Sequence, residues 1–528
     1  MRRNIAIILL LTLAACTGGK SCATKSNALP DAFVWGNGAE PPSLDPAILY
    51  DDRSFNIGMQ LFEGLTEYHP ETLEAVPGVA SSWDISPDGL VWTFHLRNNA
   101  FWSDGSPVTA ADFEYSWKRV LAPQTASQTA YMLYFIKNAE NYNAGKTTSA
   151  DDIGINVIDP QTLQITLEHP VPFFPQLVAH IAFRPVHRAT VEQWGDQWTR
   201  PEHMVSNGPY RLTSWLIQRE VVLEKNPNYW DKNNVRLAKV KFLPIEDMET
   251  ALKMQLDGVT HYTIDIPPLK VAEIKGRPDL YQSVKLDTYF YQLNTKRKPF
   301  DDMRVRRALC LAIDRRAITE TLARGDKPAT SLTPEGLHGY SPPNGCEFNP
   351  DKAKALLLEA GFADPTTFPS FTILYNTLAE HKMVAELAQS MWKQNLGINV
   401  GIQNLEWKVL LTSYVQREFD IGRYTWIGDY SDPSTFLNIF ASNSQQNYTN
   451  WVNPTYDDLV LNQAPRELNP EKRALLLKQA EEILLEEAPL VPIFNHVQPS
   501  LLDPRVRGFH PNILSLHPLK FAWFEEAK

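Results

Sequence analysis

The sequence lacks the short motifs that mark common catalytic sites. It has no G-x-S-x-G segment around a nucleophilic serine, no GxxxxGK[ST] phosphate loop and no H-E-x-x-H zinc motif. Its 12 histidines are scattered, and none forms a close pair with a third ligand, so no metal site is indicated. A triad or a carboxylate pair assembled only by folding stays open as an alternative, but no motif supports a secreted hydrolase. We therefore expect neither an enzyme nor a bound cofactor.

Long apolar runs and an excess of basic residues are missing as well. After the N-terminal region, no segment has the unbroken apolar length that crosses a bilayer. The formal net charge is −11, and acids and bases are interspersed along the chain. A nucleic-acid-binding protein would show a basic face, so this composition argues against such a partner.

Cysteine is scarce, with four residues in the chain. Cys16 and Cys22 lie near the N-terminus, which leaves only Cys310 and Cys346 in the body, so the fold does not depend on a disulfide scaffold. A bond between these two stays open, because the sequence cannot test its geometry. Cys310 lies in the helical stretch VRRALCLAIDRRAI and is expected to be a buried, unreacted thiol.

What the N-terminus does contain is a secretory signal. MRRNIAIILLLTLAAC combines a basic start, a short apolar run and small residues, which predicts a signal peptide over residues 1–15. Leu13-Ala14-Ala15-Cys16 resembles the lipobox of bacterial lipoproteins. That resemblance implies acylation of Cys16 and a membrane-anchored protein in the periplasm or at the cell surface. An ordinary signal followed by a free cysteine is the alternative. Residues 16–30 are expected to form a flexible tether.

Local patterns predict several elements of the body. VWTFHLR at 91–97 alternates like a strand, and Thr109 with Asp112 forms a capping box for a helix over 110–121. The stretch after residue 300 is helical and is expected to end at a C′ glycine, Gly325. Further helix starts are expected at Asn349-Pro350 and Asn469-Pro470, where an N-cap asparagine precedes proline.

The second half also alternates helices with strands. A helix around 380–394 leads through Gly397 into the strand INVGIQNL, and FDIGRYTWI at 419–427 suits a buried strand. At 528 residues the chain exceeds what one hydrophobic core usually supports, so two or three lobes are expected.

Ordered strings throughout the body match one family. They include PPSLDP at 41–46, LFEGLTEY at 61–68, WSDGSPVTAADFEYSWKR at 102–119, KPFDDMRVRRAL at 298–309 and GDYSDPSTFLN at 428–438. In these strings the chain resembles the oligopeptide-binding proteins that feed bacterial ABC importers, within the family of dipeptide, oligopeptide and nickel receptors (solute-binding protein family 5).

The resemblance implies an α/β, two-lobed periplasmic-binding-protein fold (type II, large three-domain variant) with a ligand cleft between the lobes. Two or three strands would link the lobes as hinges. The implied parts are lobe I (31–62, 187–289 and 497–528), an extra domain on it (63–186), and lobe II (290–496). The implied partners are short peptides, the permease subunits of an ABC importer and, through the lipid anchor, a membrane. The protein is expected to act as a monomer.

A receptor for varied peptides must hold what all peptides share, including the α-ammonium group. This group has a pKa of about 7.7–8.0, so it is largely cationic near neutral pH, and burying it unpaired costs several kcal/mol. In the family a W-x-x-D-Y aspartate pairs with it. The matching segment here runs from Trp426 to Tyr430, which assigns this role to Asp429. A turn-capping role is the alternative, and for Asp432 the Ser-Asp-Pro-Ser-Thr context favours it.

Other positions follow from the same resemblance. Arg423, His381 and Arg297 match basic residues that serve peptide carboxylates, with Arg297 replacing a lysine. Solvent-exposed charges in helices or loops are the alternative for these three. Trp407 and Trp426 match pocket walls, and Tyr131 matches a contact from the extra domain. Tyr430 belongs to the W-x-x-D-Y segment, and Tyr50 stands where the ligand backbone would be paired. Core packing is the alternative for the two tryptophans.

Two departures from the family pattern bear on the ligand. Tyr414 stands where the pattern can carry another arginine, and the loop AILYDD that contains Tyr50 also differs. Both leave the preferred peptide length open. The same fold could instead take cell-wall muropeptides, a metal chelate or haem, although Asp429 favours a ligand with a free amino group.

Overall fold

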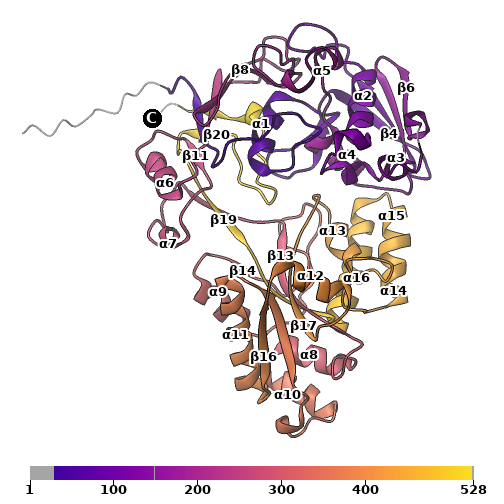
Figure 1. The fold of residues 1–528 in the computed structure, drawn as a ribbon, viewed down its shortest axis with the longest axis vertical. Helices are drawn as coiled ribbons and strands as arrows, with labels where there is room; N and C mark the ends of the chain where they lie inside the picture. The colour runs from indigo at the N-terminus through magenta and orange to yellow at the C-terminus, as the bar shows by residue number, and fades with distance from the viewer. Residues whose placement is uncertain (1–28, 148, 526–528) are drawn as a thin grey trace, which may run out of the picture.

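The computed structural model describes residues 29–147 and 149–525. The predicted signal peptide, Cys16 and all of the tether before residue 29 lie outside the described residues. Within them, no helix is both long and apolar enough to cross a membrane. The described chain forms two bodies joined by strands (Figure 1), and three main sheets lie within the three predicted parts, whose exact boundaries stay predictions.

Lobe I is built on a seven-stranded sheet of order β12-β19-β11-β1-β10-β9-β8. β1 is parallel to β10 and β11, while the other pairs are antiparallel. The strands are β1 (Phe33–Gly36), β8 (Tyr210–Leu216), β9 (Glu220–Lys225), β10 (Lys239–Leu243), β11 (Tyr262–Thr263), β12 (Leu280–Val284) and β19 (Val497–Leu502). The helices are α1 (Asp52–Leu61), α5 (Arg188–Trp194), α6 (Met248–Leu256) and α7 (Pro268–Val271). A small ribbon of β20 (Val506–Arg507) and β21 (Trp523–Phe524) lies near the C-terminal end.

The extra domain carries a four-stranded antiparallel sheet of order β4-β5-β7-β6. Its elements are β4 (Ala80–Ile85), β5 (Val91–Leu96), β6 (Ile155–Asp159), β7 (Thr162–Thr166), α2 (Ala110–Leu121), α3 (Ala139–Asn143) and α4 (Phe174–Leu177), preceded by the hairpin of β2 (Thr66–Tyr68) and β3 (Ala75–Pro77). One hydrophobic cluster contains Trp35 and Tyr262 of lobe I together with Phe113 and Trp117 of α2. The extra domain and lobe I therefore share a core.

α2 matches the prediction from its sequence. Its bounds are those predicted, and the capping box between Thr109 and Asp112 is formed. Phe113, Trp117 and Val120 lie on its buried face. Here the local cap and the spacing of apolar residues agree, so the helix could be located without tertiary information.

Lobe II contains a six-stranded mixed sheet of order β14-β18-β13-β17-β15-β16. Its strands are β13 (Asp287–Leu293), β14 (Lys327–Pro328), β15 (Phe371–Asn376), β16 (Val400–Leu405), β17 (Ile421–Ile427) and β18 (Leu490–Asn495). Its helices are α8 (Met303–Leu311), α9 (Arg315–Leu322), α10 (Pro350–Glu359), α11 (Ala379–Leu396), α12 (Trp407–Val415), α13 (Ser434–Leu437), α14 (Pro454–Asp458), α15 (Ala464–Arg466) and α16 (Pro470–Glu487). Every residue of β13 is buried, as expected for a central strand covered on both faces.

Two expectations in lobe II were wrong. The helical stretch after residue 300 is two helices, because Asp314 caps the start of α9, and α9 ends at Ala323 in the left-handed region rather than at Gly325. Cys310 is not a free thiol. It forms a disulfide with Cys346, and the two Cα atoms are 5.7 Å apart. Both cysteines are buried in the lobe II core, which brings the end of α8 against the segment before α10.

Two neighbouring crossings connect the lobes. β12 continues into β13, and β18 continues into β19, so the chain passes twice between the lobe I and lobe II sheets. The linkers contact each other, since the Lys285 amide donates to the His496 carbonyl at 2.8 Å. This agrees with the expected hinge of two or three strands. The two linkers are thus the covalent connection between the lobes (Figure 1), and a further hydrophobic cluster, which includes Met59 of α1 and Phe436 of α13, packs the two bodies against each other.

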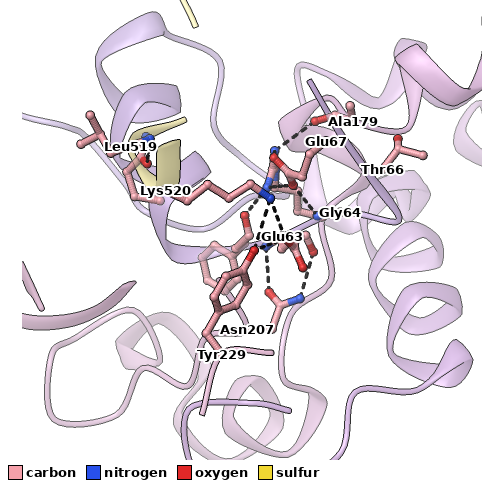
Figure 2. Close-up of polar contacts among 12 residues, drawn as sticks. Glu63, Gly64, Thr66, Glu67, Ala179, Asn207, Tyr229, Leu519 and Lys520 are labelled. Carbon is pink, nitrogen blue, oxygen red and sulfur yellow. Dashed lines mark hydrogen bonds and ion pairs between the residues drawn. The ribbon is translucent and has the colours of Figure 1, made fainter. Parts of the chain in front are cut away.

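A buried polar network fixes the root of the extra domain to lobe I (Figure 2). Arg184 donates to both carboxylate oxygens of Glu67, at 2.6 and 3.0 Å. Glu63 accepts from Tyr229 and, at 3.1 Å, from Lys520 near the C-terminal end. Burial raises the pKa of Glu63, and Lys520 opposes that effect. Removing one partner of such a buried set usually costs several kcal/mol, so the extra domain is held rigidly against lobe I.

Candidate functional site

A cleft of about 700 Å³ separates lobe I from lobe II beside the linkers. Lobe I lines it with Arg53, Met248, Ile264, Asp265, Ile266, Pro268 and Val271, and the linkers contribute Lys285, Asp287, His496, Val497, Gln498 and Pro499. Lobe II contributes Arg324, Asp326, Leu378, Glu380, His381, Trp407, Arg423, Thr425 and Ile427. The cleft is thus an apolar space with several fixed charges, which is typical of small-molecule sites.

Arg423 lies on β17, at the lobe II wall of this cleft. It is 9% exposed, and its guanidinium donates to Asn376 at 3.3 Å and to Thr425 at 2.6 Å. Its Cζ lies 4.7 Å from the centre of the Tyr289 ring. No carboxylate of the described chain lies within ion-pair distance of it. Arg423 is therefore a buried cation that a ligand anion could neutralise.

His381 and Trp407 line the same lobe II wall. His381, in the first turn of α11, is buried next to Tyr289, with ring centres 5.6 Å apart. Burial and the nearby Arg423 charge lower the pKa of His381 to about 4, so it is neutral at physiological pH and can donate or accept a hydrogen bond. Trp407 opens α12 and is 42% exposed, as a pocket wall requires.

Asp429 lies two residues after the end of β17. Its Oδ1 accepts from the hydroxyl of Tyr131 at 3.2 Å, and its amide donates to Thr435 at 3.0 Å. Burial raises the pKa of Asp429, and the Tyr131 contact opposes this shift. Over residues 29–147 and 149–525, no cation pairs with Asp429. Its contact with Tyr131 joins the extra domain to lobe II across 298 residues of sequence.

The unpaired cation and the unpaired acid are borne by one segment. Arg423 and Asp429 are six positions apart, which is about 20 Å of extended chain at the rise of a strand. β17 pairs through its backbone with β13 over its full length and with β15 near its start. A ligand with separated positive and negative groups would find opposite charges at the two ends of this stretch.

Two of the aromatic candidates have packing roles. Tyr430 stacks on Phe173 of the extra domain, with ring centres 4.7 Å apart and an interplanar angle of 11°. Trp426 packs against a hydrophobic cluster that includes Met59 of lobe I and Phe290 of lobe II. Its buried Nε1 has no hydrogen-bond partner in the described parts of the chain. Tyr430 therefore helps hold the extra domain against lobe II at the position of Asp429.

The cleft lining does not include Tyr50 or Arg297, and it does not include Asp429, Tyr131, Trp426 or Tyr430 either. Tyr50 is 53% exposed and stands just before Asp51, the N-cap of α1. Arg297 pairs with Asp420 at 2.9 Å, at the end of β17 opposite Asp429. In this open arrangement neither Tyr50 nor Arg297 lines the cleft. Their contacts with a ligand therefore remain predictions.

Asp432 and Tyr414 have structural contacts. Asp432 accepts from the Ser434 amide at 3.0 Å, as its turn context predicts, and it also forms a buried ion pair with Arg473 at 2.6 Å. Tyr414 is buried, and its hydroxyl donates to the Arg423 carbonyl at 2.6 Å. Its ring fills the space beside Gly422, where a Cβ would lie 2.4 Å from Tyr414 Cε1. The position that can carry an arginine in the family thus supports the backbone of β17 here.

A charged cluster at the linkers was not foreseen. His496 contacts Asp287 at 2.9 Å and Glu380 at 3.6 Å, and Glu380 also pairs with Arg324. Burial would lower the pKa of His496, but the two carboxylates outweigh it and raise that pKa to about 9. The cluster joins residues up to 209 positions apart. The one local indication in the sequence was that Glu380, a member of this cluster, stands next to the predicted site residue His381.

Comparison with known proteins identifies the family of this chain. Residues 74–448 match the model of the bacterial extracellular solute-binding proteins, family 5. The chain belongs to this family. It is 38% identical over 95% of its length, and 93% of the relative's, to the periplasmic oligopeptide-binding protein OppA of Salmonella typhimurium. As a family 5 member it is a solute-binding protein rather than an enzyme.

Solved structures of family 5 proteins indicate its conformation. The murein tripeptide-binding protein MppA in its unliganded open form superposes with a TM-score of 0.90, at 37% identity, over 94% of this chain and 98% of that one. Haemophilus influenzae OppA in complex with the peptide RPPGFSPFR gives 0.67, at 35% identity, over 94% and 99%. The family 5 chain described here therefore adopts an arrangement of lobes like that of the open form.

Proposed function

We propose that this protein captures short peptides between its lobes and delivers them to the membrane subunits of an ABC importer. The observation that carries the proposal is the unpaired cation Arg423 in the cleft wall, with the unpaired acid Asp429 six residues further along the same segment and outside the cleft lining of this open arrangement. A peptide is a chain with an ammonium at one end and a carboxylate at the other, so it could satisfy both. The names of relatives such as the Salmonella OppA support the same ligand class.

Closure of the lobes would supply the binding energy. In the open form, ligand groups touching lobe II remain open to water on the lobe I side. Only a closed form contacts the ligand from both lobes, so the ligand shifts the population toward closure. Asp429 would take the α-ammonium, and Arg423 with neutral His381 would take the carboxylate.

The test compares a free tripeptide with its N-acetylated form by calorimetry. Wild-type protein should prefer the free amine, and Asp429→Asn should remove most of that preference, because a buried ammonium loses its partner. The expected loss for the free peptide is about 3 kcal/mol, or roughly a hundredfold in Kd. Asp458→Asn, at an exposed site of lobe II, is the matched control and should behave as wild type. An undiminished preference in Asp429→Asn would refute the role of Asp429, and no binding of either peptide would refute the function.

Cell-wall murein peptides are a second candidate, favoured by the superposition on the open form of the murein tripeptide-binding protein. Mass spectrometry of ligands released by denaturing the purified protein separates the two. Ordinary α-linked peptides support the first candidate, and γ-linked muropeptides support the second.

We also propose that the protein is a lipoprotein anchored through Cys16, on the strength of the Leu-Ala-Ala-Cys sequence. Cys16→Ser should move the protein from the membrane fraction to the soluble fraction. A wild-type protein that is already fully soluble would exclude the anchor.

A further inference from the structure

Arg53 lies in the lobe I wall of the cleft, and Arg423 and His381 lie in the lobe II wall. It lies in the first turn of α1, where the helix dipole favours acids and disfavours cations. Asp51 and Asp52 follow that preference, and Arg53 does not. The stability of α1 therefore does not explain an arginine at this position.

Arg53 is held in place by a buried acid. Its Nη2 donates to Asp265 Oδ1 at 2.6 Å, and the Asp265 side chain is 8% exposed. Burial raises the pKa of Asp265, while Arg53 opposes that shift. Asp265 follows β11 and is fixed by its amide, which donates to Thr263 Oγ1 at 3.2 Å. The pair is thus a positioned group, not a freely moving surface contact.

Gly38 provides the space for this pair. Its φ is +75°, and a Cβ there would lie 2.6 Å from Arg53 Cζ and 2.7 Å from Asp265 Oδ2. The neighbouring Asn37 donates to the Arg53 carbonyl at 3.1 Å. Backbone and side chains from three separate segments therefore converge on one guanidinium.

The guanidinium has unused hydrogen-bonding capacity. It carries five N–H groups, and Nη2 makes the one hydrogen bond formed by its side chain within the described ranges. Its Nη1 is buried without an acceptor, as is Asp265 Oδ2 without a donor. The Arg53 side chain is 24% exposed against 8% for Asp265, so the charge that reaches the cleft is positive. A ligand oxygen would reach the exposed part of this guanidinium and not the buried Nη1.

The surroundings suit a side chain with an apolar stem and an anionic end. Leu378 and Trp407 line the facing wall and are 50% and 42% exposed. Lys285, on the linker, also lines the cleft and has no ion-pair partner among the residues that the structure describes. Acidic groups in the cleft already pair with Arg324, His496 or Arg53 itself. Arg423 would be used by the ligand's main-chain carboxylate, which leaves Arg53 and Lys285 as the cations open to a second acid. Of these two, Arg53 is the one held in a fixed position, by Asp265.

We propose that Arg53, oriented by Asp265, selects ligands that carry an acidic side chain. This inference rests on the proposed peptide function and names a side-chain preference within it. Arg53 would contact the side-chain carboxylate, and Asp265 would be a positioning residue.

The experiment is calorimetry with tripeptides in which one residue at a time is Glu, Gln or Lys on an alanine background. For at least one position, wild-type protein should bind Glu at least tenfold more tightly than Gln, and Lys most weakly. Arg53→Gln should reduce the Glu advantage at that position to less than about threefold while changing the Kd of the Gln peptide little. Arg211→Gln, at an exposed position of strand β8, is the matched control and should keep the wild-type order.

Asp265→Asn tests the positioning role. If Asp265 fixes the orientation of Arg53, Asp265→Asn should reduce the advantage of the Glu peptide over the Gln peptide while changing the Kd of the Gln peptide little, whereas a purely structural role would weaken the binding of all three peptides equally. Equal weakening of Glu, Gln and Lys peptides by Arg53→Gln would overturn the proposal, since it would make Arg53 a contact between closing lobes. A wild-type protein with no Glu preference at any position would also overturn it. If the alanine tripeptide itself does not bind, the peptide function fails first.

Discussion

At the scale of single residues, the most unusual side chain outside the cleft is Glu481. It lies on α16, is fully buried, and accepts from the amides of Leu332 and Thr333 at 2.9 and 2.7 Å and from the Tyr340 hydroxyl at 2.5 Å. Burial nevertheless raises its pKa to about 7 from 4.5. The folded protein therefore binds a proton at Glu481 that the unfolded chain releases at lower pH.

This pKa makes a prediction for stability. Because the pKa is higher in the folded state, the contribution of Glu481 to stability is greatest below pH 4.5 and falls as the pH rises to about 7, above which the carboxyl is ionised in both states. The full difference corresponds to about 3 kcal/mol. Glu481→Gln should remove this decline, as measured by urea unfolding between pH 4.5 and 8. The exposed neighbour Glu482→Gln is the control, and a decline equal to that of wild type in Glu481→Gln would refute the assignment.

A site residue could be predicted from the sequence only where it lies in a segment that matches a family motif. The segment from Trp426 to Tyr430 resembles the family, so Asp429 could be named in advance. Its contact with Tyr131 was not predicted, because no local rule relates residues 298 positions apart. No motif or local pattern in the sequence indicated that Arg53 and Asp265 would form a pair. They become a pair only when β11 and α1 meet in lobe I.

At the scale of elements, one histidine holds the two linkers between the lobes together. His496 sits between β18 and β19, and Asp287 begins β13, so their contact joins the two crossings. Its pKa of about 9 lies above the ordinary 6.5. The stabilisation is therefore fully present below pH 6.5 and is lost as the pH rises through 9.

His496→Gln should lower the free energy of unfolding by about 2 kcal/mol at pH 7 and by much less at pH 10. Denaturant unfolding across this range is the measurement, with the exposed His169→Gln as control. Parallel pH profiles of His496→Gln and wild type would contradict a charged histidine in the linkers.

Element boundaries were predictable where caps and periodicity agree. α10 and α16 begin at the expected Asn-Pro pairs, and α11 ends at Gly397 in the left-handed region. The break between α8 and α9 was missed because both flanks are rich in helix-forming residues. Ala323 ends α9 in a left-handed conformation for which alanine has no local preference, so tertiary packing decides that boundary.

At the scale of the whole molecule, the lobes should move as bodies. Lobe I and the extra domain share a core and the buried network of Figure 2, and lobe II has a core of its own. Another cluster, which includes Met59 of lobe I and Phe436 of lobe II, packs between the two bodies. Tyr131 and Tyr430 already connect the extra domain to lobe II in the open arrangement. Closure is therefore expected to narrow the cleft on the side of α6 and α7, away from these contacts.

Small-angle scattering checks this expectation. A saturating peptide ligand should reduce the radius of gyration of wild-type protein, because the closed form is more compact. Moving a two-state population from 1:99 to 99:1 needs about 5.5 kcal/mol of differential binding. Asp429→Asn should show no such change at the same peptide concentration. A ligand that binds tightly without changing the scattering curve would exclude closure as the source of affinity.

The two ends of the described chain lie side by side, which has a mechanical consequence. Phe33 near the start and Phe524 near the end have ring centres 6.1 Å apart, and both belong to lobe I. The chain enters and leaves lobe II through two adjacent linkers, whose backbones are hydrogen-bonded to each other. A pulling force applied between the ends would be carried within lobe I, starting at this contact, and would leave the strands of lobe II unloaded. A tether attached at the N-terminal end could thus be stretched while the lobe that moves stays free to open and close.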